Sequence, residues 1–154
     1  MARSREYAAT VTVSRNELVK MSIAQDEVIR NGGFDSGRTD VAALIAGLSG
    51  IGATILGLMF IASTPVGIAT GIASLASSLL GAGTGSRVND YLQDGVNGMN
   101  RIVNTIIDND LQYDLYQIKF PFLEYTLQDD TVIRFITGNG VILKAHSENG
   151  WEVF

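Results

Sequence analysis

The stretch that decides the fold runs from Val41 to Ser86 and reads VAALIAGLSGIGATILGLMFIASTPVGIATGIASLASSLLGAGTGS. Its 46 residues include no Asp, Glu, Lys, Arg or His, and glycine recurs throughout. A helix on the surface of a soluble protein normally carries charged side chains on its outer face. We therefore expect this segment to lie in a dry environment, either a membrane or a protein interior.

A proline near the middle divides the stretch into two predicted helices. Val41 to Ala62 is apolar or small apart from Ser49 and Thr54, and its 22 residues would cross roughly 30 Å of hydrocarbon as one helix. Pro65 cannot continue a helix and favours an extended conformation in the residue before it, so residues 63–67 are predicted to form a turn. A second helix is expected over residues 67–83, giving a helical hairpin that would be able to span a membrane.

Small residues recur at every fourth position along this hairpin, which permits close approach of helix backbones. The positions on which we expect helix packing or membrane insertion to depend are Ser49, Ala53, Gly57, Pro65, Gly67, Gly71, Ser74 and Ser78. The rest of the chain is short, and we expect it to be unable to wrap two helices that are apolar all round. Lipid or other copies of the chain are therefore expected to cover the hairpin.

The residues before the hairpin predict a strand and a helix. Residues 7–13 are β-branched and roughly alternating, which is typical of a short strand. Ser14 and Glu17 have the spacing of a capping box and predict the start of a helix over residues 15–30, which Asn31-Gly32-Gly33 ends.

The residues after the hairpin change from a helical to a strand period. Residues 86–110 place apolar side chains three and four apart, which predicts an amphipathic helix. Residues 113–127, 131–137, 141–146 and 151–154 are rich in aromatic and β-branched residues, and Asn139-Gly140 is a strong hairpin signal. Pro121 indicates an edge or a bulge. We expect a small C-terminal antiparallel β-meander.

Together these patterns predict an α+β chain in three parts. Residues 1–40 form an N-terminal strand and helix, residues 41–85 the apolar helical hairpin, and residues 86–154 the amphipathic helix and the β-meander.

Charge is scarce and unevenly distributed. Only 18% of the residues are charged, against about 25% in typical globular domains. Residues 1–40 carry six basic and six acidic side chains, whereas residues 87–154 carry five basic and ten acidic ones, so the net charge of −5 lies in the C-terminal part. Nucleic acid is therefore not expected as a partner, because its phosphates require a basic surface.

The sequence offers no constellation typical of catalysis. His146 is the one histidine, and cysteine is absent. A catalytic cysteine–histidine pair and a metal site with thiolate ligands are therefore both excluded. Asp108, Asp110 and Asp114 lack the glycine and the terminal glutamate of a calcium loop. The run Gly81–Gly85 is not followed by the Gly-Lys-Ser/Thr of a phosphate loop. We expect no enzyme activity, no metal and no cofactor.

Aromatic residues concentrate near the C-terminal end of the sequence. They would pack in the core of the sheet, or form a docking surface for neighbouring subunits or an interfacial belt at a membrane. The residues concerned are Tyr113, Tyr116, Phe120, Phe122, Trp151 and Phe154.

The apolar hairpin resembles the one that α-helical pore-forming toxins hide and then insert, and it also resembles small phage proteins that breach the bacterial envelope, such as holins and tail-tip components. The resemblance covers residues 41–83 and rests on hydrophobicity. It implies a self-assembling, membrane-inserting protein whose partners are the lipid bilayer and other copies of itself in a homo-oligomer.

Two alternatives remain open. In one, the protein is a structural subunit of a larger assembly such as a phage tail or injection machine, with the hairpin buried between subunits. In the other, it is a membrane anchor whose C-terminal sheet binds a partner. From the apolar hairpin we expect a location at a membrane or in a secreted or virion-like assembly. The first residues do not have the pattern of a cleavable signal peptide.

Overall fold

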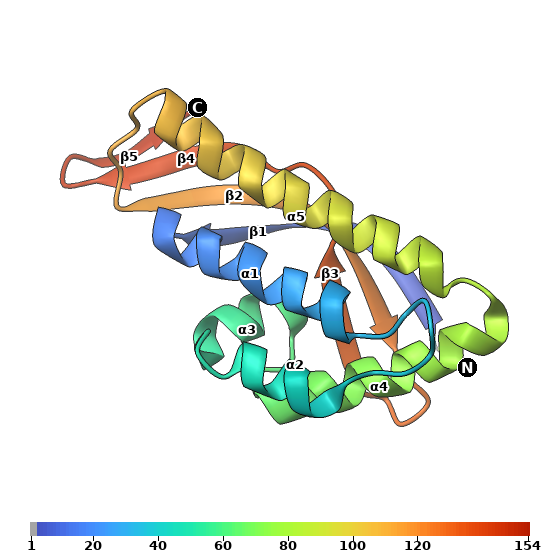
Figure 1. Ribbon diagram of the computed structural model, residues 1–154. Helices are drawn as coiled ribbons and strands as arrows, with labels where there is room; N and C mark the ends of the chain where they lie inside the picture. The colour runs from blue at the N-terminus through green and yellow to red at the C-terminus, as the bar shows by residue number, and fades with distance from the viewer. Residues whose placement is uncertain (1–2) are drawn as a thin grey trace.

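The computed structural model describes residues 3–154 and has an α+β fold in which five helices pack against one five-stranded antiparallel sheet (Figure 1). In chain order the elements are β1 (Arg3–Val13), α1 (Arg15–Asn31), α2 (Val41–Leu48), α3 (Ala53–Phe60), α4 (Pro65–Ala82), α5 (Gly85–Asp108), β2 (Leu115–Thr126), β3 (Val132–Ile136), β4 (Val141–Ser147) and β5 (Gly150–Val153).

The long strand β2 is the centre of the sheet. β1 pairs with it along its whole length on one side, from Arg3 opposite Thr126 to Val13 opposite Tyr116. On the other side β4 pairs with the first half of β2 and β3 with the second half, and β5 extends the sheet beyond β4. The predicted N-terminal strand thus joins the C-terminal strands in one sheet.

The predicted hairpin turn at Asn139-Gly140 is wrong, because β3 and β4 lie end to end along β2 rather than side by side. Their junction falls at Pro121, which has no N–H to donate and whose carbonyl accepts a hydrogen bond from the N–H of Thr137 at 3.0 Å. A Cβ on Gly140 would lie 2.5 Å from the ring of Phe120, so this glycine serves close packing against β2. The C-terminal strands therefore do not form a simple meander.

The first arm of the predicted hairpin, Val41 to Ala62, is also not one helix. It forms two short helices, α2 and α3, separated by residues 49–52. Gly52 has a φ of 99°, which a helix cannot contain and which other residues rarely adopt. Ser49 ends α2, and its hydroxyl donates to the carbonyl of Ile45 at 2.6 Å.

The expectation that one copy of the chain cannot bury this segment is wrong as well. Its large side chains turn inward and join a single hydrophobic core with α1, α5 and the sheet. The residues buried in this way are Leu44, Leu48, Ile51, Ile55, Leu56, Met59, Phe60, Ile68, Ile72, Leu75 and Leu79. Figure 1 shows α2, α3 and α4 gathered below α1 and beside β3. The fold thus supplies the dry interior that the composition requires.

Helices α1 and α5 pack along each other, and α1 also contacts α2 and α3, while α3 and α4 reach β3 directly (Figure 1). The predicted capping box is present at the start of α1, since the hydroxyl of Ser14 accepts from the N–H of Glu17 and the carboxylate of Glu17 accepts from the N–H of Ser14. Most of the predicted apolar stripe of residues 86–110 is buried in α5, including Val88, Leu92 and Met99, whereas Ile107 is exposed.

Glycines let α5 approach the end of β3 closely. A Cβ on Gly95 would lie 1.9 Å from the carbonyl oxygen of Ile136, and one on Gly98 would lie 2.1 Å from that of Gly138. Gln25 of α1 reaches the same place, where its amide donates to the carbonyl of Ile136 and accepts from the N–H of that residue. A side chain therefore satisfies the outer edge of β3 in place of another strand.

Candidate functional site

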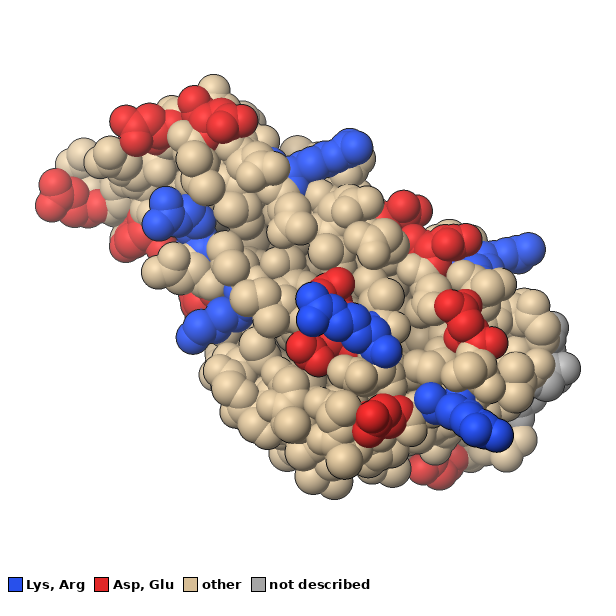
Figure 2. Space-filling model, in the orientation of Figure 1, with Lys and Arg blue, Asp and Glu red and all other residues tan. Residues whose placement is uncertain are grey.

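The outer surface of α2, α3 and α4 is exposed and uncharged, and we call it the helical face. Its exposed residues are mostly small, and a few are large and apolar. They are Val41, Ala42, Ala46, Ser49, Gly50, Gly52, Ala53, Thr54, Ile61, Ser63, Thr64, Val66, Thr70, Ser74, Ser77 and Leu80. In Figure 2 the lower left of the molecule, over α2 and α3, forms a broad area without acidic or basic side chains.

Local sequence explains how these helices present that face. Asp40 begins α2, because its carboxylate accepts from the N–H of Ala43 at 3.1 Å. Thr64 begins α4, because its hydroxyl accepts from the N–H of Gly67, and Pro65 occupies the first helical position. Large residues three and four apart then point into the core, which leaves the small residues outside.

The structure distributes the eight predicted packing positions among several environments. Ser49, Ala53 and Ser74 are exposed, while Gly57, Pro65, Gly67 and Ser78 are half-buried. Gly71 is buried, and a Cβ there would lie 3.7 Å from Ile133 of β3. The row Ser49, Ala53 and Gly57 does not exist as a helical row, because Ser49 ends α2 and Ala53 begins α3.

The corner between α3 and α4 is strained. Ile61 follows α3 with a φ of 72° and a ψ of −53°, a conformation that is unfavourable for a β-branched residue. Beside it, Nη2 of Arg134 in β3 donates to the carbonyl of Leu58 at 2.6 Å. A cation at the C-terminal end of a helix satisfies a free carbonyl and interacts favourably with the helix dipole. Arg134 thus anchors α3 to the sheet.

Arg134 belongs to a polar cluster that we did not predict from the sequence. Its guanidinium lies 4.0 Å from the centre of the Phe122 ring, and Nη1 donates to the hydroxyl of Tyr7 at 3.1 Å. The Tyr7 hydroxyl donates to the carboxylate of Glu124, which also accepts from Nε of Arg5 at 2.8 Å. The hydrogen bond from Arg5 lowers the pKa of Glu124 against the opposing effect of burial. The sequence feature that points to this cluster is a charged residue within each of two largely apolar strands, Glu124 in β2 and Arg134 in β3.

The six predicted docking residues divide into a buried and an accessible group. Tyr116, Phe120 and Phe122 are at most 1% exposed and lie in the core, so they have no surface to offer a partner. Tyr113 is half-buried, and Trp151 and Phe154 are exposed. The rings of Tyr113 and Phe154 meet edge to face with centroids 5.8 Å apart.

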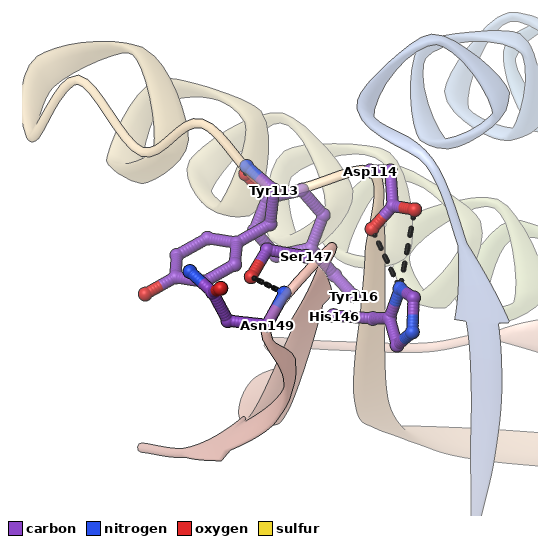
Figure 3. Close-up of polar contacts among 6 residues, drawn as sticks. All are labelled: Tyr113, Asp114, Tyr116, His146, Ser147 and Asn149. Carbon is purple, nitrogen blue, oxygen red and sulfur yellow. Dashed lines mark hydrogen bonds and ion pairs between the residues drawn. The ribbon is translucent and has the colours of Figure 1, made fainter.

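A histidine–aspartate pair lies at the same end of the sheet. Figure 3 shows the ring of His146 in β4 directed at the carboxylate of Asp114, and Nδ1 lies 2.9 and 3.1 Å from the two carboxylate oxygens. The hydrogen bond from His146 lowers the pKa of Asp114. The His146 ring also packs edge to face against the Trp151 ring, with the two ring centroids 5.1 Å apart. The pair joins the start of β2 to β4.

Two open hollows flank the segment 110–114, with volumes of about 630 and 460 Å³. The larger is lined by Asp110, Asp114, Glu148 and neighbouring residues, and the smaller also by the start of α1. Within residues 3–154, no three His, Asp or Glu side chains are grouped so that they could hold a metal ion.

One apolar stretch within residues 3–154 is long enough to cross a membrane. The stretch Ala53–Leu80 has 28 residues and comprises α3 and most of α4. Its most apolar 18-residue window has a mean hydropathy of 1.8, and 44% of that window is buried. Helices buried in soluble proteins have the same properties, so this is weak evidence for a membrane. No protein family, curated protein or solved structure matches the chain.

Proposed function

We propose that the protein is a non-enzymatic structural subunit that associates with other copies of itself through the helical face. The observation that carries this proposal is the combination of exposure and missing charge along α2, α3 and α4. The exposed side of a solvated helix normally carries charged side chains. A face without them, extended over three helices, is suited to burial against another uncharged surface.

The small side chains of the helical face favour burial against protein over burial in lipid. Ala42, Ala46, Ser74 and Ser77 are exposed, and each would gain little from transfer to hydrocarbon because its apolar area is small. The same residues allow the backbones of two helices to approach closely. Since most of the larger side chains are already used in the core, much of the gain from association would come from packing.

A second candidate is membrane insertion by α3 and α4. It is favoured by the length and hydropathy of Ala53–Leu80 and by the strained corner at Ile61. In that function lipid would replace the sheet as the partner of the large side chains of α3 and α4. The protein described here would then be the form before insertion, as the resemblance to pore-forming toxins implies.

Charged substitutions on the helical face test the proposal. We expect the purified chain to form an oligomer in detergent-free buffer, and we expect Ser74→Glu combined with Ser77→Glu to sediment as a smaller species because carboxylates would be desolvated in the interface. The matched control is Asn100→Glu with Asn104→Glu, which adds the same charge to an exposed side of α5. Sedimentation velocity and far-UV circular dichroism measure size and fold.

Liposomes added to the same samples separate the two candidates. Intact liposomes together with an oligomer that is independent of lipid agree with the subunit function. Dye release with an oligomer that forms only on lipid would replace it with membrane insertion. Flotation of a monomer without dye release would favour the membrane anchor, and a wild-type chain that stays monomeric without binding lipid would overturn the proposal.

A further inference from the structure

The sheet ends at three strand edges, and the chain protects two of them. Unpaired edges are sites of association between proteins unless charges or side chains block them. The outer edge of β3 is blocked by the amide of Gln25. The edge strand β1 carries the exposed charged residues Arg3, Arg5 and Glu6. β5 carries a single charged residue, Glu152, and within residues 3–154 no side chain bonds to its outer backbone groups as Gln25 does on β3.

The backbone of β5 presents hydrogen-bonding groups outward. The N–H of Phe154 donates to the carbonyl of Leu143, and Glu152 lies opposite Ala145, so both residues point their backbone groups toward β4. Because these groups alternate along a strand, those of Trp151 and Val153 point away from the sheet. Within residues 3–154 we find no hydrogen bond to them.

The side chains along this edge are apolar and accessible. Trp151 is 43% exposed, Val153 85% and Phe154 54%. Glu152 is the only charged residue of β5, and it points to the opposite face from Trp151, where it accepts a hydrogen bond from the hydroxyl of Tyr113. Trp151 instead meets His146 and Lys144. Glu152 is therefore the one charge on β5 itself, and a pairing of this edge must keep it away from a second carboxylate.

We infer that β5 pairs antiparallel with β5 of a second copy of this chain, with Trp151 opposite Trp151 about a two-fold axis. An axis perpendicular to the sheet preserves its two faces, so a residue can be opposite only a residue of the same face. The symmetric registers within β5 consequently centre on Trp151, on Glu152 or on Val153.

Charge and pairing select the first of these registers. Centring on Glu152 sets two carboxylates directly opposite each other, which is unfavourable. Within β5, centring on Val153 pairs that residue alone, whereas centring on Trp151 pairs residues 150–152. Centring on Trp151 places Glu152 opposite Gly150, which has no side chain, and pairs two aromatic rings across the axis. The outward N–H and carbonyl of Trp151 then exchange two hydrogen bonds with those of the second copy.

This pairing does not rest on the helical face, since it uses a different part of the molecule. Figure 1 shows β5 at the far end of the sheet from α2 and α4. If both surfaces associate, each chain has two partners, and the chains build an assembly larger than a dimer. The two surfaces can also be tested separately.

The first test uses the chain with Ser74→Glu and Ser77→Glu, in which the helical face is blocked. Sedimentation equilibrium should show a dimer in this background, and adding Val153→Lys should weaken it at least tenfold, because a lysine on the edge resists strand pairing. The matched control is Val141→Lys on β4, another exposed valine outside the β5 edge. A monomer before Val153→Lys is added, or a dimer that Val153→Lys leaves unchanged, would refute the β5 pairing. Either result would leave the proposal for the helical face unaffected.

The second test fixes the register. The chain has no cysteine, so single substitutions give unambiguous cross-links. Residues opposite each other in a hydrogen-bonded antiparallel pair have Cα atoms about 5.5 Å apart, which a disulfide spans. Trp151→Cys should therefore form a disulfide-linked dimer under mild oxidation, and Glu152→Cys and Val153→Cys should not. Cross-linking through residue 152 or 153 in preference to 151 would contradict the proposed register.

Discussion

At the scale of single residues, Glu124 and Arg134 show how much a few polar groups decide in an apolar fold. Glu124 is buried in β2, and its carboxylate is held by Arg5 and Tyr7. Arg134 lies opposite it in β3 and connects Tyr7 to the carbonyl of Leu58 at the end of α3. Three strands and one apolar helix thus meet through four side chains.

The depressed pKa of Glu124 predicts a loss of stability in acid. Because its pKa is lower in the folded protein than its ordinary value of 4.5, the unfolded chain takes up the proton first. The contribution of this carboxylate is complete above the ordinary pKa and is lost as the pH falls through the folded pKa. Urea denaturation at pH 7 and at pH 3 should therefore show a lower free energy of unfolding in acid.

The variant Glu124→Gln isolates this contribution. We expect it to lower the free energy of unfolding at pH 7 by roughly 1.5–3 kcal/mol, the usual value of hydrogen bonds to a charged group. The difference in free energy of unfolding between the variant and the wild-type chain should shrink at pH 3, because the wild-type carboxylate is protonated to a greater extent there than at pH 7. If the two chains lose stability in parallel over this range, Glu124 does not govern the acid response.

At the scale of elements, the contact between α5 and the end of β3 depends on glycine. A Cβ at Gly98 would lie 2.1 Å from the carbonyl oxygen of Gly138, so Gly98→Ala must push the helix away from the strand. We expect a loss of about 1–3 kcal/mol, the usual cost of overpacking. Chemical denaturation with a constant m-value measures it.

Gly50→Ala is the control for this substitution, because no atom lies within 4 Å of the Cβ that it would add. Its effect should stay within about 0.5 kcal/mol, as for other unhindered surface positions. The opposite result for Gly98→Ala, a gain of about 1 kcal/mol from the higher helix propensity of alanine, would mean that α5 does not approach β3 as described.

Predictability also differs between elements. The start of α1 and the buried stripe of α5 followed from local patterns, namely the capping box of Ser14 and Glu17 and the three-and-four spacing of Val88, Leu92 and Met99. The break between α2 and α3 was missed, since Gly52 is compatible with a continuous helix until its φ is known. The meander correctly implies that β3 pairs with β2, but not that β4 also pairs with β2, because Asn139-Gly140 has the sequence of a hairpin between β3 and β4. The length of β2 provides room for both strands in succession.

At the scale of the whole molecule, the apolar segment and the sheet share one hydrophobic core. Leu75 of α4 and Phe120 of β2 are both fully buried in it. We therefore expect native-state hydrogen exchange to give the amides of these two residues the same free energy of opening, equal to that of global unfolding. A much lower value for Leu75 would contradict this and would indicate that α4 opens separately, as membrane insertion requires.

The sequence by itself determined that the large apolar side chains of residues 41–86 need shielding from water, that helices and an antiparallel sheet make up the rest, and that charge lies outside this segment. These properties follow from composition and local periodicity, which do not depend on distant residues. Only the tertiary structure decided what shields the segment, because burial depends on which surfaces meet. Contacts such as Arg134 with Leu58 and Gln25 with Ile136 join residues 76 and 111 positions apart, and no local pattern specifies them.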